Sequence, residues 1–206
     1  MTATPPQQVR DADQLGGRLE LLDPATLDAD QARLREELLA TRGPDAEAAG
    51  FQLVLPDGRL IGPFNAWLRA PAVGQAIRGW AAAVNRYDLP EDVQQVTILT
   101  VGAAWRSPYE IYAHRAEARH AGVAEEAIAA ILADEPPPGL SAPALTAHRF
   151  TRALVVEHDV SDDLYAEAVG AFGQAGLFAL VNIIGRYLNT SAILACFRVP
   201  APQPAQ

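Results

Sequence analysis

Cysteine is nearly absent from this chain of 206 residues, in which Cys196 is the single example. No disulfide can form within the chain, and a reducing cytoplasm is the simplest compartment to expect. We expect Cys196 to be a buried packing residue. No set of His, Cys, Asp and Glu residues has metal-ligand spacing, so the sequence predicts neither a metal site nor a cofactor.

Basic residues are also scarce. The chain carries 16 Lys and Arg residues against 25 Asp and Glu residues, which gives a formal net charge of -9. This acidity argues against nucleic acid or an anionic membrane as the main partner. It leaves a small anionic substrate open, because one Arg in a pocket can bind a carboxylate.

Long unbroken apolar runs are missing too. Residues 176–197 are the most apolar region, but Arg186 interrupts them, and the unbroken parts are shorter than the ~20 residues of a membrane span. The region therefore predicts a buried core helix or an oligomer interface. Arg186 must find a carboxylate or carbonyl partner there, and a structural ion pair is favoured over a substrate clamp. The first ten residues contain no apolar segment of the signal-peptide type.

Helical patterning dominates what is present. Half of the residues are hydrophobic and a fifth are charged, which is a globular composition. We predict one helical domain with a flexible arm over residues 1–18, a Pro-rich linker over 134–142 and a frayed tail over 200–206. A turn is expected at Pro56–Gly58. The fold class is all-α, a compact bundle of about eight or nine helices. Helices are expected over residues 29–41, 73–84, 90–104, 107–122, 124–133, 141–157, 161–173, 174–187 and 190–197, with a short helical piece over 66–69.

The segment from Ser107 to His114 is the best candidate for chemistry. Ser107, Glu110 and His114 share one face of a helix, because they lie three and four residues apart. One interpretation is purely structural. Ser107 and Glu110 then form a capping box with Pro108 at the first helical position, and His114 is a core histidine.

The other interpretation is functional. The helix N-terminus is expected to keep Glu110 ionised, and the carboxylate then orients the imidazole of His114 and favours its protonated form. Imidazole titrates near neutral pH and can therefore move a proton there. Trp105 and Tyr109 lie beside this face in the sequence, and such aromatic residues with a few polar groups are typical of a small-molecule pocket.

Residues 55–195 contain a moderately specific motif, Tyr109-Glu110-x-x-x-His114 with Ala118 and Gly122 downstream. It is accompanied by the segments Asp57–Phe64, Leu68–Pro71, Val96–Val101 and Ile183–Tyr187. In these segments the chain resembles the carboxymuconolactone decarboxylase / AhpD-like family. The resemblance implies an AhpD-like helical fold and assembly into trimers or hexamers.

The resemblance also bears on the type of reaction. Peroxide-linked members of the family carry a Cys-x-x-Cys pair at positions that match Ser107 and Glu110, a histidine that matches His114 and a glutamate that matches Gln95. Three of these four residues are absent here, so hydroperoxide reduction is not expected. Decarboxylase-type members lack the cysteines and use a histidine-centred pocket without a cofactor.

By this resemblance we expect His114 to be the general acid/base and Glu110 its orienting partner. Gln95 is a candidate donor to a developing enolate oxygen, and Ser107 is a supporting polar group. Two interpretations of Tyr187 stay open: a phenol near the site, or the end of a helix at an interface. The candidate wall residues are Trp105, Tyr109, Phe64 and Trp67.

The predicted function is decarboxylation of a small lactone or keto acid by a cofactor-free, cytoplasmic homo-oligomer. Its partners are a small-molecule substrate and further copies of the chain, without nucleic acid or membrane. A cofactor-free isomerase or cyclase of secondary metabolism uses the same residues and is the first alternative. A non-catalytic ligand-binding or assembly protein, in which Glu110 is only a helix cap, is the second.

Overall fold

The computed structural model describes residues 13–202, and the regular elements within that range are helices. The all-α prediction is confirmed, and the described residues contain eight α-helices. A single isolated bridge, Val54 with Leu60, closes the predicted turn at Pro56–Gly58. The elements are η1 (Pro24–Thr26), α2 (Ala29–Ala49), α3 (Pro63–Trp67), α4 (Pro71–Val84), η2 (Asn85–Tyr87), α5 (Glu91–Trp105), α6 (Pro108–His120), α7 (Glu125–Leu132), α8 (Ala142–Arg152), the π-helix η3 (Ala153–Glu157) and α9 (Asp162–Phe197).

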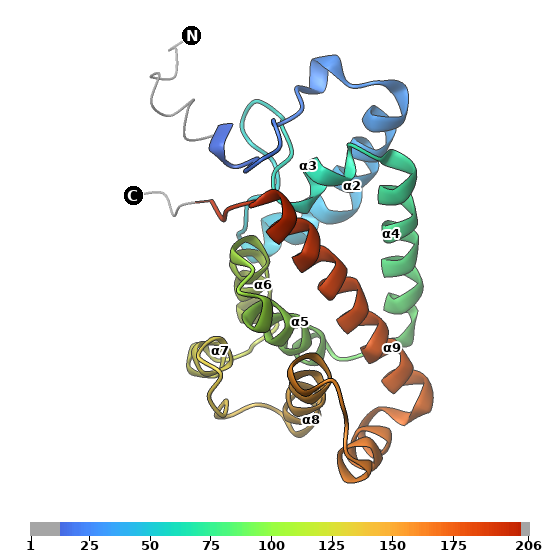
Figure 1. Ribbon diagram of the computed structural model, residues 1–206, viewed down its shortest axis with the longest axis vertical. Helices are drawn as coiled ribbons and strands as arrows, with labels where there is room; N and C mark the ends of the chain where they lie inside the picture. Colours follow the sequence, from blue (N-terminus) through green and yellow to red (C-terminus); the bar gives the residue numbers. More distant parts are fainter. Residues whose placement is uncertain (1–12, 203–206) are drawn as a thin grey trace.

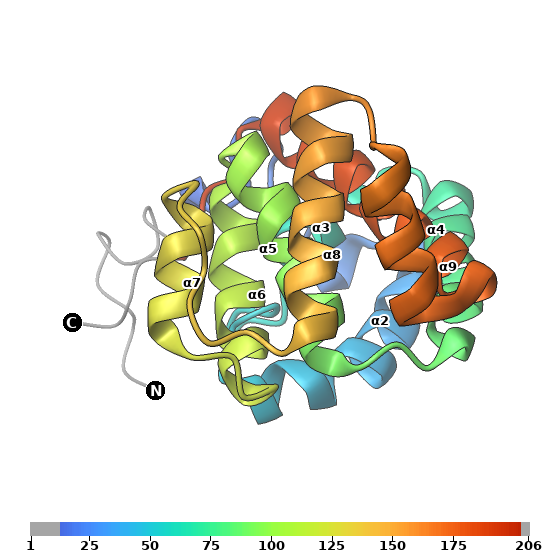
Figure 2. The same cartoon turned by 90° about the horizontal axis from the view of Figure 1, so that it is seen from below.

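Helix α5 is the centre of the bundle. It packs against α6, α7, α8 and α9, and Figure 2 shows α7, α6, α5 and α8 side by side. Its sequence is apolar nearly all round, with nine buried residues, which is the pattern of a helix enclosed on every side. The hydroxyls of Thr97 and Thr100 donate to the carbonyls of Val93 and Val96 one turn earlier. The β-branched run of α5 is therefore accommodated in a helix.

Helix α9 crosses the molecule between α6 and α4 (Figure 1) and joins the two hydrophobic clusters of the fold. Ile183 and Ile184 belong to one cluster, and Leu194 to the other. Its one break is at Gly173, whose φ of 66° is left-handed. The predicted interruption between residues 187 and 190 is wrong, because the Thr190 hydroxyl donates to the Arg186 carbonyl within an unbroken helix.

By length and composition alone, α9 could cross a membrane. In the fold it packs against α3, α4, α5 and α8, and its buried face supplies ten core positions. This arrangement agrees with the predicted core helix.

Helix α2 continues beyond its predicted end at Gly43-Pro44 and stops at Gly50. Pro44 lies inside the helix and leaves one backbone acceptor without its usual partner. An ion pair of 2.7 Å between Arg42 and Asp45 spans the same turn. Gly50 ends the helix with a φ of 77°, and its N–H donates to the Ala46 carbonyl.

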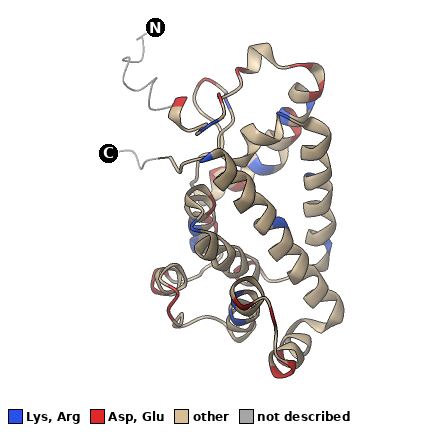
Figure 3. Ribbon diagram, in the orientation of Figure 1, with Lys and Arg blue, Asp and Glu red and all other residues tan. Residues whose placement is uncertain are grey.

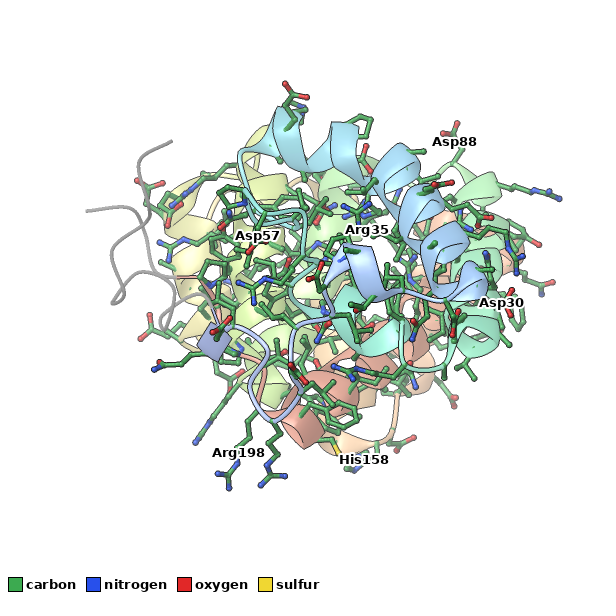
Figure 4. All side chains as sticks on the ribbon, turned by 90° about the horizontal axis from the view of Figure 1, so that it is seen from above. Asp30, Arg35, Asp57, Asp88, His158 and Arg198 are labelled. Atoms are coloured by element: carbon green, nitrogen blue, oxygen red, sulfur yellow. The ribbon has the colours of Figure 1, made fainter. Side chains whose placement is uncertain are left out.

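Residues 13–18 contact the end of α9, and the loop that precedes α3 contacts α2. The backbone N–H of Arg18 donates to the Phe197 carbonyl, so residues 13–18 of the predicted arm lie against the end of α9. The rest of that arm, and residues 203–206 of the predicted tail, lie outside the described residues. Arg35 donates to the carbonyl of Gly58 at 2.8 Å, next to Asp57 in the turn (Figure 4).

Gly62 allows a test of stability, because it lies against the Tyr109 ring at the end of the loop that precedes α3. Its φ of 65° and ψ of -148° are accessible mainly to glycine, and a Cβ there would overlap the Tyr109 ring. We expect Gly62→Ala to lower the free energy of unfolding by at least about 3 kcal/mol. Gly50→Ala is the matched control, since its φ is also positive but no atom lies near the added Cβ.

The control should cost only about 1 kcal/mol, the strain of the left-handed backbone alone. Urea denaturation of both variants measures the difference. Equal costs would mean that the Tyr109 ring does not restrict this loop.

Candidate functional site

A cavity of about 270 Å³ lies between α2, α4, α5, α6 and α9, where the two hydrophobic clusters meet. Its aromatic walls are Phe51, Phe64, Trp67, Tyr109 and Tyr187. Its ionisable and amide groups include Arg42, Asp45, Arg78, Gln95, Glu110, His114, Glu117 and Arg186. Apolar walls with a small set of convergent polar groups are the usual form of a small-molecule site.

His114 is held by two acceptors on its Nδ1 atom. The Oε1 atom of Gln95 lies 2.8 Å away, and the Oε2 atom of Glu117 lies 3.1 Å away. The Gln95 amide cannot be reversed without loss, because its Nε2 atom donates to Glu117 Oε2 at 3.0 Å. Nδ1 therefore carries a proton, and Nε2 is the nitrogen left for chemistry.

Glu117 is the ionised member of this group. Burial raises the pKa of its carboxyl, but the charge and hydrogen bond of His114, together with Arg42, outweigh burial and hold the pKa well below its ordinary value. Arg42 donates to Glu117 Oε1 at 2.5 Å and to Asp45 at 2.7 Å. The imidazole therefore lies beside a fixed negative charge, 3.1 Å from its Nδ1 atom.

Glu117 was missed in the sequence, although it lies three residues after His114 on the same helix face. That spacing is a usable signal for a partner. The role of Arg42 has no comparable signal in the sequence, because 75 residues separate it from Glu117.

Glu110 has a different environment from the predicted one. Its side chain is 2% exposed and accepts a hydrogen bond of 2.8 Å from the Ser191 hydroxyl on α9. Burial raises the pKa of the Glu110 carboxyl to about 8, against the opposing effects of Ser191 and Arg186. The carboxyl is therefore mostly protonated at neutral pH, and the prediction that it stays ionised is wrong.

The predicted roles of Glu110 as cap and as orienting partner are also wrong. Ser107 is the N-cap residue of α6 by backbone geometry, but no side-chain hydrogen bond caps the helix. Within residues 13–202, Glu110 makes no hydrogen bond or ion pair with His114, because its side chain turns toward Ser191. Gln95 and Glu117 orient the imidazole instead.

The remaining predicted site residues divide into two groups. Phe64, Trp67, Tyr109 and Gln95 line the cavity as expected. Both ends of the Gln95 amide are engaged, so this residue positions His114 rather than facing an enolate. Trp105 is 42% exposed at the end of α5 and is not a wall, since α5 ends there and points it outward.

Ser107 and Cys196 lie outside the cavity lining. The Ser107 hydroxyl is buried without a partner among the described residues. Cys196 is exposed in the last turn of α9, so the expectation of a buried packing residue is wrong. Cys196 lies on the outward face of α9, so it is exposed although the surrounding segment is apolar.

Tyr187 lies in the cavity wall beside His114 and Arg186. Its ring is edge-on to the His114 ring, with centroids 4.9 Å apart. Arg186 stacks over it, with Cζ 4.7 Å from the centroid. Burial raises the pKa of the Tyr187 phenol, so the hydroxyl stays protonated. Of the two interpretations left open, the one near the site agrees with this placement.

Arg186 contradicts the expectation of a structural ion pair. Its guanidinium makes no hydrogen bond or ion pair with the described residues, and Nε is buried without a partner. Arg186 forms no ion pair with Glu110, because the Glu110 carboxyl is directed to the Ser191 hydroxyl. Among residues 13–202, no group of three or more His, Cys, Asp and Glu residues is placed to hold a metal ion.

Two solved structures share this fold. One is an alkylhydroperoxidase AhpD core protein, an uncharacterized peroxidase-related protein from Ralstonia eutropha JMP134. It is 14% identical over 90% of this chain and 92% of its own, with a TM-score of 0.72. The other is the debrominase Bmp8 in complex with 2,3,4-tribromopyrrole, 15% identical over 85% and 89% of the two chains, with a TM-score of 0.65.

The AhpD-like fold is thereby shown. No protein-family profile matches the sequence, and no curated protein matches it. The likeness to the solved structures therefore rests on the arrangement of helices.

The raised pKa of Glu110 predicts a pH-dependent stability. A carboxyl with a pKa near 4.5 in the unfolded chain and about 8 in the fold binds its proton more tightly when folded. Its contribution to stability is full below pH 4.5 and falls, by up to roughly 1.4 kcal/mol per pH unit, as the pH rises toward 8. Glu110→Gln should remove this loss, so its melting temperature should exceed that of the wild type increasingly between pH 5 and pH 8.

Glu126→Gln is the matched control, because Glu126 is exposed on α7. Its melting temperature should follow that of the wild type over the same range. Parallel curves for Glu110→Gln and the wild type would show that Glu110 is ionised in the fold.

Proposed function

We propose that this protein is a cofactor-free enzyme in which His114 transfers a proton to or from a small organic substrate in the cavity. The observation that carries the proposal is the pair of acceptors on Nδ1, Gln95 and Glu117. They fix the tautomer and leave Nε2 as the reactive nitrogen. An imidazole with one oriented nitrogen and one unpartnered nitrogen is the usual form of a general acid/base.

Glu110 supplies the second part of the proposed mechanism. A buried, protonated carboxyl in the same cavity is a hydrogen-bond donor, and such a donor stabilises an enolate oxygen as charge develops on it. Protonated Glu110 and ionised Glu117 therefore line one cavity. Glu110 is the hydrogen-bond donor to the substrate, and Glu117 positions His114 for the proton transfer.

The reaction that we propose is decarboxylation of a small lactone or keto acid. The bond between the α-carbon and the carboxylate breaks, and its electron pair moves into the neighbouring carbonyl to form an enolate. Carbon dioxide leaves, and protonated His114 gives its Nε2 proton to the α-carbon. A solvent proton then restores the imidazolium, whose charge Glu117 stabilises.

The solved structures of similar fold support an enzyme more than they support one reaction. They are a peroxidase-related protein and a debrominase, and the debrominase holds a small halogenated pyrrole. We do not propose hydroperoxide reduction, because the single cysteine of this chain lies outside the cavity. A thiol–disulfide cycle needs two thiols within reach of the substrate.

Two alternatives make different demands on the same site. A cofactor-free isomerase or cyclase uses His114 first as base and then as acid, and its product keeps every carbon atom of the substrate. A non-catalytic ligand-binding protein would leave the substrate unchanged. Assembly into trimers or hexamers stays a prediction, and Phe178 of α9, 66% exposed, is a candidate contact.

Solvent deuterium incorporation tests the proposal without knowledge of the natural substrate. A panel of carboxylactones and β-keto acids is incubated in D₂O, and NMR records carbon-bound deuterium and loss of the carboxyl carbon. We expect His114→Gln to reduce both by at least about 100-fold, with a melting temperature within a few degrees of the wild type.

His148→Gln is the matched control, since His148 is equally buried but bonds to Thr100 away from the cavity. It should retain the wild-type rate. Full activity in His114→Gln, or no exchange in the wild type on any member of the panel, would contradict the proposal. Exchange without loss of carbon would favour the isomerase or cyclase.

A further inference from the structure

Three arginines line the cavity, and their partners differ. Arg42 is bound to Glu117 and Asp45. Arg78 is bound to Glu37 and Gln75. Arg186 has no carboxylate, carbonyl or hydroxyl partner within the described part of the chain. Its charge is therefore the one cationic charge of the described lining that no acidic group balances.

No acidic residue of α9 lies close to Arg186 along the helix. Arg186 is the only basic residue of α9, and the acidic residues of that helix, Asp162, Asp163 and Glu167, all lie in its first two turns. Figure 3 shows the rest of α9 without other charged residues. Glu110 is protonated at neutral pH and hydrogen-bonded to Ser191, so it does not neutralise the guanidinium.

The unpaired cation is partly shielded from water, with its Nε atom buried. Removing a charge from water without pairing it is destabilising, and the stack on Tyr187 offsets this only in part. The indole Nε1 of Trp67, in the same cavity, is also buried without an acceptor. Within residues 13–202, the lining therefore holds two buried donors without acceptors and one positive charge without an acidic partner.

We propose that Arg186 binds the carboxylate of a small organic acid, and that the substrate of the proposed enzyme is such an acid. That the bound acid is a substrate rests on the proposed function, whereas the binding of an acid at Arg186 rests on the cavity alone. A guanidinium presents two parallel N–H donors that match the two oxygens of a carboxylate. The aromatic walls then receive the organic body of the acid.

The position of Tyr187 relates this anchor to the proposed reaction. The Arg186 Cζ atom lies 4.7 Å from the centroid of the Tyr187 ring, and the centroid of the perpendicular His114 ring lies 4.9 Å from it. The guanidinium and the imidazole therefore adjoin one ring of the cavity lining.

The charge of the cavity selects a carboxylate over a phosphate. One unbalanced guanidinium neutralises one negative charge, whereas a phosphate monoester is close to a dianion at neutral pH. The second charge would enter a cavity whose lining already holds the carboxylates of Glu117 and Asp45. Phosphate esters should therefore bind more weakly than carboxylates of the same size.

Calorimetric titration with benzoate, benzamide and phenyl phosphate at pH 7 tests the inference. We expect the wild type to bind benzoate at least about 30-fold more tightly than benzamide, because charge-assisted bonds form only with the carboxylate. Arg186→Met keeps the apolar stem and removes the charge, so it should bind the two compounds equally. Its melting temperature without ligand should equal or exceed that of the wild type, since an unpaired charge is removed.

Arg78→Met is the matched control, because it removes a cavity arginine that already has a partner. It should change the preference for benzoate by less than about threefold. Equal binding of benzoate and benzamide by the wild type, an unchanged preference in Arg186→Met, or tighter binding of phenyl phosphate would each overturn the inference. No binding of benzoate at all would overturn it as well.

His114→Gln separates this inference from the proposed function. It should keep the preference for benzoate while it loses deuterium exchange. Retained exchange in His114→Gln would end the proposed function and leave the anion site standing. Lost preference in the wild type with normal exchange would end the anion site alone.

Discussion

The Glu117 carboxylate is the group on which the candidate site depends. One of its oxygens binds both Gln95 of α5 and His114 of α6, and the other binds Arg42 of α2. Three helices are thereby joined at one buried charge. Removal of that charge would leave Arg42 with Asp45 alone and the imidazole free to change its tautomer, because an oriented histidine depends on the partner of its second nitrogen.

The fold places this charge where water is largely excluded. Helix α5 is enclosed by α6, α7, α8 and α9, and the cavity opens where the two hydrophobic clusters meet. The same enclosure gives two carboxyls on α6 opposite protonation states. Glu117 has cationic partners and stays ionised, whereas Glu110 has only a hydroxyl and keeps its proton. Environment rather than residue type separates their roles.

Most helices could be predicted from the sequence, because buried positions repeat at the helical spacing in α6 and α7, and Pro90 with an acidic first turn marks the start of the nearly all-apolar α5. The errors lie where tertiary contacts override local signals: Pro44 does not end α2, and residues 187–190 do not interrupt α9. At the site, His114 and its cavity could be predicted, but its partners could not. The spacing of Glu110 fitted a capping box equally well, and the contacts that decide its state come from Ser191, 81 residues away.

The imidazole tautomer of His114 tests the central claim most directly. Long-range nitrogen–proton NMR spectra of ¹⁵N-labelled protein, assigned with His114→Gln, distinguish a protonated Nδ1 from a protonated Nε2. The account predicts that neutral His114 carries its proton on Nδ1 in the wild type, and that Glu117→Gln yields a mixture of both tautomers. A wild-type neutral histidine with its proton on Nε2 would contradict the account, because Nδ1 would then donate no hydrogen bond to Gln95 and Glu117.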